Sequence, residues 1–427
     1  MLMFPDSDDE DGEGGLPPPG GGGGGSAADQ MAQSFMLSQS GSFHTDDFKV
    51  NKGGLTASKH HSPEAASAAA ARAAVPVVNS IVDLETLNEL GAGASGTVFR
   101  AKHRDSGDIF AVKQVTILDK PKRDQVVTEL KMLMSHNGCP WIVSLYNAFY
   151  EEAKVYTVLE FMDAGSVADL VEKHKDVGMR DERELAKIGL QMLNGLNYLH
   201  KTMHQVHRDL KPANVMLKSN GAVKISDFGI SSQLDSTAAH CSTFVGTTCY
   251  MSPERCARRR ASEPPLRSFL ALVHGLPSDR ASTTPPSFPW PSAGTRNPDE
   301  PRPLSRASAP SPGSLSGEHY NYTADIWAFG MILLELACGK YPYPEADSYF
   351  KLLEQIMDGP APNVPEEEDF SPAFAEFLGL CLDKEPGPRP PAHELIRHPF
   401  LRQYPLIDDM LLSGMLDAMS ISGGPVG

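Results

Sequence analysis

The sequence has few cysteines, few aromatic residues, a deficit of positive charge and no apolar run long enough to cross a membrane. Its 427 residues include six cysteines, and 7% of the residues are aromatic. Lys and Arg total 38 against 54 Asp and Glu, which gives a net charge of -16. This excess of acid argues against a nucleic-acid binder that is held by a basic surface.

The cysteines and the apolar runs indicate where the protein works. The cysteines are not spaced like metal ligands or redox pairs, and no basic N-terminal region precedes an apolar core. We therefore expect a reducing compartment, either the cytoplasm or the nucleus. The most apolar run, Ile326 to Cys338, falls short of the roughly 20 residues that a membrane-spanning helix needs. We interpret it as a buried core helix and expect no membrane span.

The N-terminal segment has a composition that does not support folding. Residues 1–79 begin with an acidic run and continue with prolines, consecutive glycines and an alanine-rich stretch. Such a segment buries too little apolar surface to fold, so we predict a disordered region over 1–79. The stretch from Ser34 to Phe43 mixes aromatic residues and serines. This stretch could dock on a partner or on the folded body. Alternatively, it is part of a tail that contains scattered apolar residues.

The middle of the chain changes from strand-like to helical patterns. Thr97 to His103 and Ile109 to Val115 alternate like strands and flank a turn-rich segment, which predicts a hairpin. A helical period follows around Val126 to Leu133, and another spans Leu185 to Leu199. Strands first and helices later predict an α+β fold, with a small β-rich lobe joined to a larger helical lobe.

A second segment of unusual composition interrupts the helical part. Between Arg255 and Ser316 the sequence is rich in proline and serine and has little periodicity, which predicts a disordered insertion. Helical patterns resume at Tyr320, so we predict one domain, over 84–402, that is interrupted late. The expected units are an N-terminal region (1–79), a β-rich lobe (84–160), a helical lobe (161–402) that contains the insertion (257–315), and a C-terminal tail (403–427).

Three glycines form the pattern GAGASGTV. Gly91, Gly93 and Gly96 are spaced so that backbone amides can approach phosphate oxygens without interference from Cβ atoms. The strand-like alternation from Val98 disfavours a dinucleotide-binding fold, which needs a helix directly after the last glycine. Taken alone, the pattern is equally compatible with a plain glycine turn.

A lysine and a glutamate indicate a nucleotide cleft. Ala111 and Lys113 share one face of the second strand, and a lysine beside a small apolar residue suits such a cleft. Glu129 lies within the apolar stripe of the following helix, where an unpaired carboxylate is costly to bury. We therefore predict a Lys113–Glu129 ion pair that forms only when the helix is docked inward and thus acts as a switch.

A third cluster runs from His207 to Asn214 and is followed by two short strands and Asp227. A two-residue turn at Asn220-Gly221 would place Asn214 opposite Asp227, with Cα atoms about 5 Å apart. An amide oxygen and a carboxylate so placed suit a magnesium ion that also holds phosphates. Asp209, at the mouth of this hairpin, is free to orient a hydroxyl nucleophile and accept its proton.

These segments together resemble the signature set of eukaryotic protein kinases. GAGASGTV, AVK, HRDLKPAN, DFG and SPE occur in that order, and the resemblance covers about residues 84–402. Asp325 and Arg389 also match the family, the latter as the partner of Glu254. The resemblance implies a bilobal protein kinase fold and phosphoryl transfer by positioning and charge stabilisation, with ATP and Mg²⁺ as cofactors.

The resemblance assigns roles to individual residues. The implied catalytic set is Asp209, Lys113, Glu129, Lys211, Asn214 and Asp227, of which Asn214 and Asp227 also hold the metal. The implied nucleotide-binding set is Leu90, Gly91, Ala92, Gly93, Ala94, Ser95, Gly96, Val98, Ala111, Lys113, Glu160, Met162 and Met216. Ala111 and Met216 would bracket the adenine, and Leu159 would guard the deeper pocket.

The segment from Cys241 to Arg255, CSTFVGTTCYMSPER, looks like the MAP kinase kinase family. This family phosphorylates Thr and Tyr in the activation loop of a MAP kinase, and Lys211 matches kinases that act on Ser or Thr. The likeness implies activation by a MAP kinase kinase kinase at Thr237 and Thr243, with the spacing of plant and protist members. The stretch from Ser34 to Phe43 also resembles the segment before the catalytic domain in plant-type members.

Several alternatives stay open. Ser236 and Ser242 have the same spacing as the two threonines, and all four hydroxyls could simply fill a loop. The acidic N-terminus lacks the docking motif typical of the family, which leaves the substrate open. The chain is alternatively a Ser/Thr kinase of another signalling family or a non-catalytic scaffold disabled by its insertion. The insertion itself is a lineage-specific loop, a non-coding segment left in the gene product, or a docking element.

Overall fold

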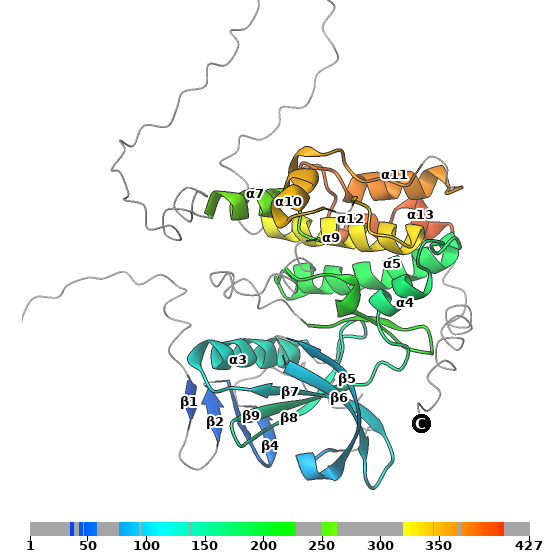
Figure 1. The fold of residues 1–427 in the computed structure, drawn as a ribbon. Coiled ribbons are helices and arrows are strands. Elements are labelled where there is room, and N and C mark those ends of the chain that lie inside the picture. The colour runs from blue at the N-terminus through cyan, green and yellow to red at the C-terminus, as the bar shows by residue number, and fades with distance from the viewer. Residues whose placement is uncertain are drawn as a thin grey trace, which may run out of the picture.

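A computed structural model describes ten stretches of the chain. They are residues 35–37, 42–45, 47–57, 77–93, 96–136, 138–227, 249–262, 319–344, 346–365 and 369–404. Within these stretches the chain forms two lobes, one built on β-sheets and one on helices (Figure 1). The predicted α+β class is therefore confirmed.

Five antiparallel strands form the main sheet of the β-rich lobe, in the order β5-β6-β7-β9-β8. Their bounds are β5 Leu84–Gly93, β6 Gly96–His103, β7 Ile109–Thr116, β8 Leu145–Glu151 and β9 Lys154–Glu160. The predicted hairpin is confirmed, because β6 pairs with β7 from Thr97–Gln114 to Lys102–Ile109. Gly107 lies in its turn at φ +80°, a backbone conformation that favours glycine.

The single long helix of this lobe, α3 (Lys120–Ser135), lies across the sheet (Figure 1). Asp119 caps it, since its carboxylate accepts a hydrogen bond from the backbone N–H of Lys122. Its buried side chains are Val126, Glu129, Leu130 and Leu133, which confirms the predicted stripe. Leu133 packs into the core of the helical lobe, so the helix contacts both lobes.

A second sheet precedes the first, and the predicted disorder of 1–79 is wrong for its strands, which lie between Phe35 and Ala57. Residues 1–34 and 58–76 lie outside the described residues. Strands β1 (Phe35–Leu37), β2 (Phe43–Thr45), β3 (Phe48–Asn51) and β4 (Gly54–Ala57) pair antiparallel in chain order. The average composition of the segment concealed a local alternation in β3, whose residues Phe48 and Val50 are both 0% exposed. Strands β3 and β4 lie against β8, so this part of the segment docks on the folded body.

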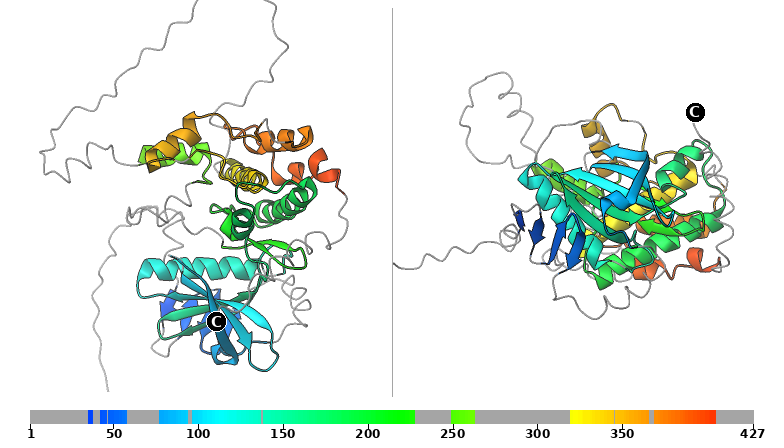
Figure 2. Two further views of the ribbon diagram at one scale, coloured as in Figure 1. Left: turned by 45° about the vertical axis from the view of Figure 1, so that its right-hand side comes forward. Right: turned by 90° about the horizontal axis from the view of Figure 1, so that it is seen from below.

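The helical lobe contains most of the remaining elements. Its helices are α4 Val167–Lys173, α5 Glu182–Asn197, α7 Pro253–Ser262, α9 His319–Cys338, α10 Tyr349–Asp358, α11 Pro372–Cys381, α12 Ala392–Leu395 and α13 Pro399–Arg402. A two-stranded hairpin, β10 (Val215–Leu217) and β11 (Val223–Ile225), lies on the side that faces the β-rich lobe (Figure 2).

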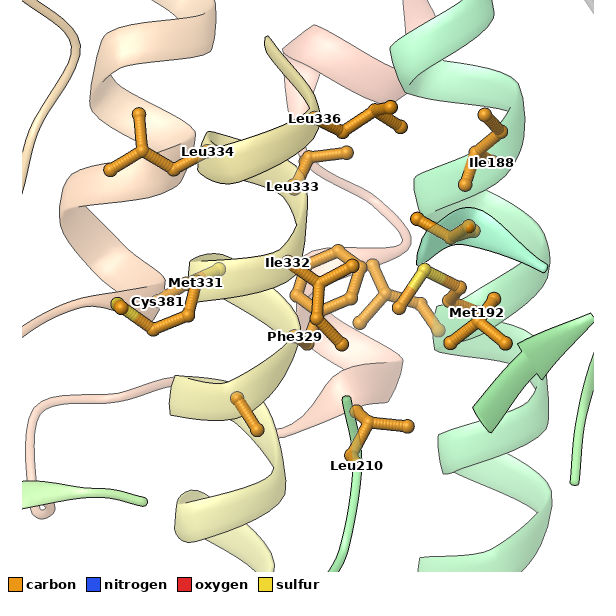
Figure 3. Close-up of a cluster of buried hydrophobic side chains, with 14 of the residues drawn as sticks. Ile188, Met192, Leu210, Phe329, Met331, Ile332, Leu333, Leu334, Leu336 and Cys381 are labelled. Atoms are coloured by element: carbon orange, nitrogen blue, oxygen red, sulfur yellow. The ribbon is translucent and has the colours of Figure 1, made fainter. Parts of the chain in front are cut away.

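Helix α9 is the centre of this lobe. Phe329 and Ile332 of α9 face Ile188 and Met192 of α5, while Met331 points toward Cys381 of α11 (Figure 3). The apolar run from Ile326 to Cys338 is thus the predicted buried core helix. Among the described helices, none combines the length and apolar character that a bilayer crossing requires.

Helix α7 corrects the predicted start of the insertion at residue 257. The helix continues to Ser262, because PERCARRRAS is rich in alanine and arginine and contains no proline after Pro253. Pro253 at the start and Glu254 in the first turn also favour a helix here. The rest of the predicted insertion, up to residue 315, lies outside the described residues.

Candidate active site between the lobes

Lys113 of β7 is the centre of a buried charge cluster. Its Nζ lies 2.6 Å from Oε1 of Glu129 on α3, which confirms the predicted ion pair. It also lies 2.7 Å from Oδ1 of Asp227, a contact that the sequence did not predict. Burial alone would lower the pKa of Lys113, but the charges of Glu129 and Asp227 outweigh it and raise the pKa. The lysine is therefore a fixed cation between two carboxylates.

Asp227 lies two residues after the end of β11 and is half exposed, unlike Lys113 and Glu129. The charge of Lys113 lowers the pKa of this carboxyl, so it is ionised at neutral pH. Its φ is +48°, in the left-handed region that non-glycine residues rarely adopt. Such strained residues cluster at functional sites, which fits the predicted role of Asp227 as a metal ligand.

The predicted register of the β10–β11 hairpin is wrong by one residue. Val215 pairs with Ile225, and the backbone N–H of Ser226 donates to the carbonyl of Asn214 at 2.9 Å. Asn214 therefore faces Ser226, and Asp227 lies one residue beyond the predicted position.

The cause of this shift is the type of turn. The backbone N–H of Lys218 donates to the carbonyl of Ala222 at 2.9 Å, so three residues, not two, form the loop. Gly221 closes the loop at φ +84°, as in a type I turn followed by a bulge. An Asn-Gly pair is typical of both two-residue and three-residue loops, and the backbone hydrogen bond between Lys218 and Ala222 identifies the three-residue loop here.

Asp209, Lys211 and Asn214 lie together, with the carboxylate of Asp209 bonded to the other two side chains. Oδ2 of Asp209 accepts hydrogen bonds from Nζ of Lys211 at 3.0 Å and from Nδ2 of Asn214 at 3.2 Å. The same amide nitrogen donates to the carbonyl of Asp209 at 2.8 Å. Because the nitrogen of Asn214 is engaged by Asp209, its amide oxygen is the atom left to bind a metal ion.

Asp325, at the start of the buried part of α9, holds the backbone that leads to Asp209. Its carboxylate accepts from the backbone N–H groups of His207 at 2.8 Å and Arg208 at 3.0 Å. It also contacts Nε2 of His200 at 2.8 Å. Arg208 adopts φ +68°, a strained conformation that these bonds stabilise. The resemblance pointed to Asp325, but only the structure shows which groups it binds.

Glu160, at the end of β9, has two lysine partners that the sequence did not reveal. Its carboxylate lies 2.8 Å from Nζ of Lys218 and 2.7 Å from Nζ of Lys224. Burial would raise the pKa of Glu160, but the hydrogen bonds from the two lysines lower it. Both lysines belong to the β10–β11 hairpin, so this cluster joins the two lobes. Isolated lysines near a turn carry no signal for such a contact.

The glycine-rich segment includes the end of β5 and the start of β6, where Gly93 pairs with Gly96. A Cβ atom on Gly91 or Gly93 would have no neighbour within 4 Å, whereas one on Gly96 would lie 2.5 Å from the carbonyl oxygen of Gln114. Gly96 also adopts φ +126°. Gly96 is thus required by the fold, whereas Gly91 and Gly93 leave open space beside the backbone.

The other predicted nucleotide-binding residues lie on neighbouring strands. Val98 of β6 pairs with Lys113, and Ala111 of β7 pairs with Leu159 of β9. Met162 is buried just after β9, and Met216 lies in β10. Leu90 and Ala92 lie in the exposed end of β5. The predicted residues outside the described ones are Ala94, Ser95, Thr237 and Thr243.

A depression lies beside Asp209, between the loop that carries it and α7 and α9. Its lining residues are Arg208, Asp209, Leu210, Tyr250, Met251, Arg255, Ala324, Asp325 and Ala328. Arg255 donates from Nη1 to the carbonyl of Arg208 at 2.6 Å. Arg389 holds α7 from the other side through two 2.9 Å bonds to Glu254, which confirms the predicted pair.

The oxygen ligands at the site suit a magnesium ion. In the part of the chain that the structure describes, no group of three or more His, Cys, Asp and Glu residues is placed to hold a metal. Magnesium usually takes one or two protein oxygen ligands and completes its shell with water and phosphate oxygens. The carboxylate of Asp227 and the amide oxygen of Asn214 match that requirement.

Comparisons with known proteins agree with this geometry. A family model described as protein kinase domain matches residues 84–265 and 310–401. Mitogen-activated protein kinase kinase 1c of Physcomitrium patens is 33% identical over 381 residues, which cover 87% of this chain and 91% of that protein. Mitogen-activated protein kinase kinase 2 of Arabidopsis thaliana is 33% identical over 396 residues, which cover 90% of this chain and 89% of that protein.

Proposed function

Because the chain belongs to the protein kinase family and is an enzyme of the MAP kinase kinase type, we propose that it phosphorylates a MAP kinase on both Thr and Tyr. The phosphoryl donor would be ATP. The observation that carries the proposal is the Lys113–Glu129 pair, formed within reach of Asp227. A fixed cation of this kind supports the binding of nucleotide phosphates beside it.

The charges of the cluster fit phosphoryl transfer. Glu129 holds the ammonium of Lys113 in place, and that ammonium would bind the phosphate oxygens of ATP. Asp227 and Asn214 would hold Mg²⁺, which neutralises negative charge on the phosphates. Gly91 and Gly93 have room for phosphate oxygens beside the backbone, where their amides can donate hydrogen bonds.

Asp209 would serve the hydroxyl that is phosphorylated. Its carboxylate lies at the depression and is fixed by Lys211 and Asn214, so it can orient the Thr or Tyr hydroxyl of the substrate. The hydroxyl oxygen forms a bond to the γ-phosphorus while the bond to ADP breaks, and Asp209 accepts the hydroxyl proton. Lys211 would balance the charge that develops on the transferred group.

Activation would come from an upstream MAP kinase kinase kinase. Thr237 and Thr243 precede Cys249 in the chain, and the described structure resumes at the depression that Arg208 and Arg255 line. Phosphates on the two threonines would be attracted to such arginines and would order the segment. The pattern around Thr243 and the names of the relatives support this assignment.

The test uses the full chain with Thr237→Glu and Thr243→Glu, mixed with ATP, Mg²⁺ and a MAP kinase made inactive by mutation. We expect mass spectrometry to find phosphate on both Thr and Tyr of the MAP kinase activation loop. Products on Ser and Thr alone would favour a kinase of another signalling family. The control carries Asp209→Asn as well and should transfer no phosphate; equal transfer with and without Asp209 would contradict the assigned role.

A further inference from the structure

The hairpin of β3 and β4, residues 48–57, packs on the helix that carries Glu129. Phe48 and Val50 belong to one hydrophobic cluster with Val126 and Leu130 of α3, and Leu55 packs against the same cluster. Val126 and Leu130 flank Glu129 in the helix, three residues before it and one after it. Figure 1 shows the N-terminal strands standing against α3 and beside β8. The hairpin thus covers the part of α3 that positions the glutamate.

Polar contacts fix this hairpin at both ends of its interface. Next to β3, the carboxylate of Asp47 lies 2.7 Å from Nζ of Lys131 on α3. On the other side, Lys52 lies 2.6 Å from Glu151 of β8. The backbone N–H of Leu55 donates to the side chain of Asn147, also in β8, at 2.9 Å. The hairpin therefore connects α3 to the edge strand of the main sheet.

Gly54 shows how closely the hairpin approaches this strand. A Cβ atom at Gly54 would lie 2.9 Å from Nδ2 of Asn147, and Gly54 adopts φ +106°. Asn147 in turn donates to the carbonyl of Val78, the second residue of the described stretch 77–93. Such close backbone approach indicates a built interface, not a loose contact.

We propose that the β3–β4 hairpin positions α3, so that Glu129 stays paired with Lys113 and the enzyme remains in its active arrangement. Phe48 and Val50 are the positioning residues, because they bury the outer face of α3 next to Glu129. The contacts of the hairpin described above are with α3 and β8, so we infer that it acts through Glu129. The kinetic consequence rests on the proposed function, whereas the mechanical coupling of hairpin and helix does not.

The first test measures amide hydrogen exchange in the full-length protein with Phe48→Ala and Val50→Ala. Truncating two buried side chains loosens the helix that they cover, so we expect exchange in α3 to be about tenfold faster or more. Exchange in α5 and α9 of the helical lobe should stay unchanged. The matched control is Lys49→Ala, on the opposite face of the same strand, which should leave α3 at the wild-type rate. Unchanged exchange in α3 of the double variant would overturn the proposal.

The second test asks whether the effect passes through Glu129. In the protein that carries Thr237→Glu and Thr243→Glu, the Phe48→Ala and Val50→Ala changes should raise KM for ATP by about tenfold, with kcat less affected. When Glu129→Ala is added to this protein, the same changes should have no further effect, because the pair is already lost. Additive effects in the two backgrounds would show that the hairpin only supports folding. Absence of any ATP turnover by the protein with Thr237→Glu and Thr243→Glu alone would refute the proposed function and leave the exchange result valid.

If the double alanine variant does not fold, swapping the charges of the Asp47–Lys131 ion pair provides a further test of the proposal. Asp47→Lys alone and Lys131→Asp alone place like charges across the interface and should speed exchange in α3 by a few fold. Combining the two changes restores opposite charges and should restore the wild-type exchange rate. Failure of the combined variant to restore that rate would overturn the proposal.

Discussion

The ammonium of Lys224 lies 2.7 Å from Oε2 of Glu160, and both side chains are nearly buried. Glu160 ends β9, the strand that leads out of the β-rich lobe, whereas Lys224 is in β11, shortly before Asp227. Lys218 reaches the other carboxylate oxygen of Glu160 from the same hairpin. These two ion pairs therefore fix the hairpin of Asn214 and Asp227 against the sheet that carries Lys113.

The first prediction is that these two lysines contribute unequally to the free energy of unfolding. Lys224→Met should lower the free energy of unfolding by about 1–3 kcal/mol, because it leaves a buried carboxylate with one partner fewer. Lys218→Met is the matched control. Its side chain is 30% exposed, so its loss should cost less than about 1 kcal/mol. Urea unfolding at pH 7 measures both.

Acid provides a second check on this ion-pair cluster. The lysines lower the pKa of Glu160 from its ordinary value of 4.5, so its pairing stabilises the fold above that pH and is lost as pH falls through the folded-state pKa. The difference between wild type and Lys224→Met should thus shrink below pH 4. A difference that stays constant down to acid unfolding would mean that Lys224 acts through packing instead.

The second prediction separates two roles of glycine at the end of β5 and the start of β6. Gly96→Ala should destabilise the protein by about 1–3 kcal/mol, because of its positive φ and the nearby carbonyl of Gln114. Gly93→Ala has open space and should change stability by less than about 0.5 kcal/mol. It should nevertheless raise KM for ATP, since the new methyl group occupies the space proposed for phosphate. Thermal unfolding measures the change in stability, and steady-state kinetics measure KM for ATP. An unchanged KM in Gly93→Ala would exclude close approach of phosphate at Gly93.

The sequence predicts those parts of the site that depend on local periodicity. Glu129 falls in the apolar stripe of its helix, and Lys113 lies on one face of its strand, so their pairing follows from two short patterns. The register of Asn214 and Asp227 depends on whether the loop between β10 and β11 has two residues or three. An Asn-Gly pair is compatible with both loop lengths. A one-residue error there changes which residues face each other.

Two of the features that the sequence did not reveal are the ion pairs of Glu160 and the N-terminal hairpin. The contacts of Glu160 with Lys218 and Lys224 span about 60 residues and leave no pattern in either segment. The N-terminal hairpin was concealed for another reason, since composition was averaged over residues that include long glycine and alanine runs. Its four-residue strand FKVN alternates as strands do, but it is too short to stand out in that average.

The third prediction is a dependence of stability on pH that originates at Glu335 of α9. Burial raises the pKa of Glu335, whose carboxylate accepts a hydrogen bond from the hydroxyl of Tyr250 at 2.5 Å. Its stabilising contribution is complete below its unfolded pKa, near 4.5, and is lost as pH rises through the folded-state value. Glu335→Gln keeps an acceptor for Tyr250 and removes the charge, so it should stabilise the protein at pH 8 relative to wild type.

Urea unfolding at pH 5 and pH 8 tests this expectation. The advantage of Glu335→Gln should be smaller at pH 5 than at pH 8. Glu394→Gln, at an exposed position of α12, is the control and should show little effect at either pH. An equal advantage at both pH values would show that the charge of Glu335 is not responsible.

The fourth prediction is that residues 266–309, which the protein kinase model leaves unmatched, are dispensable for folding. Helix α7 is anchored before them by Glu254 and Arg389, and α9 begins after them at His319. Deleting 266–309 shortens the connection between α7 and α9 nearly fivefold, which changes the free energy of loop closure by only about 1.4 kcal/mol. Thermal unfolding should therefore shift by only a few degrees.

Arg389→Ala is the comparison for this deletion. It leaves the buried carboxylate of Glu254 without its cation and should cost about 3–5 kcal/mol, which shows what loss of the α7 anchor looks like. A deletion variant as unstable as Arg389→Ala would mean that 266–309 helps to hold α7. A stable deletion variant with altered phosphorylation of the MAP kinase would instead assign the segment to substrate access, since α7 lines the depression at Asp209 through Arg255.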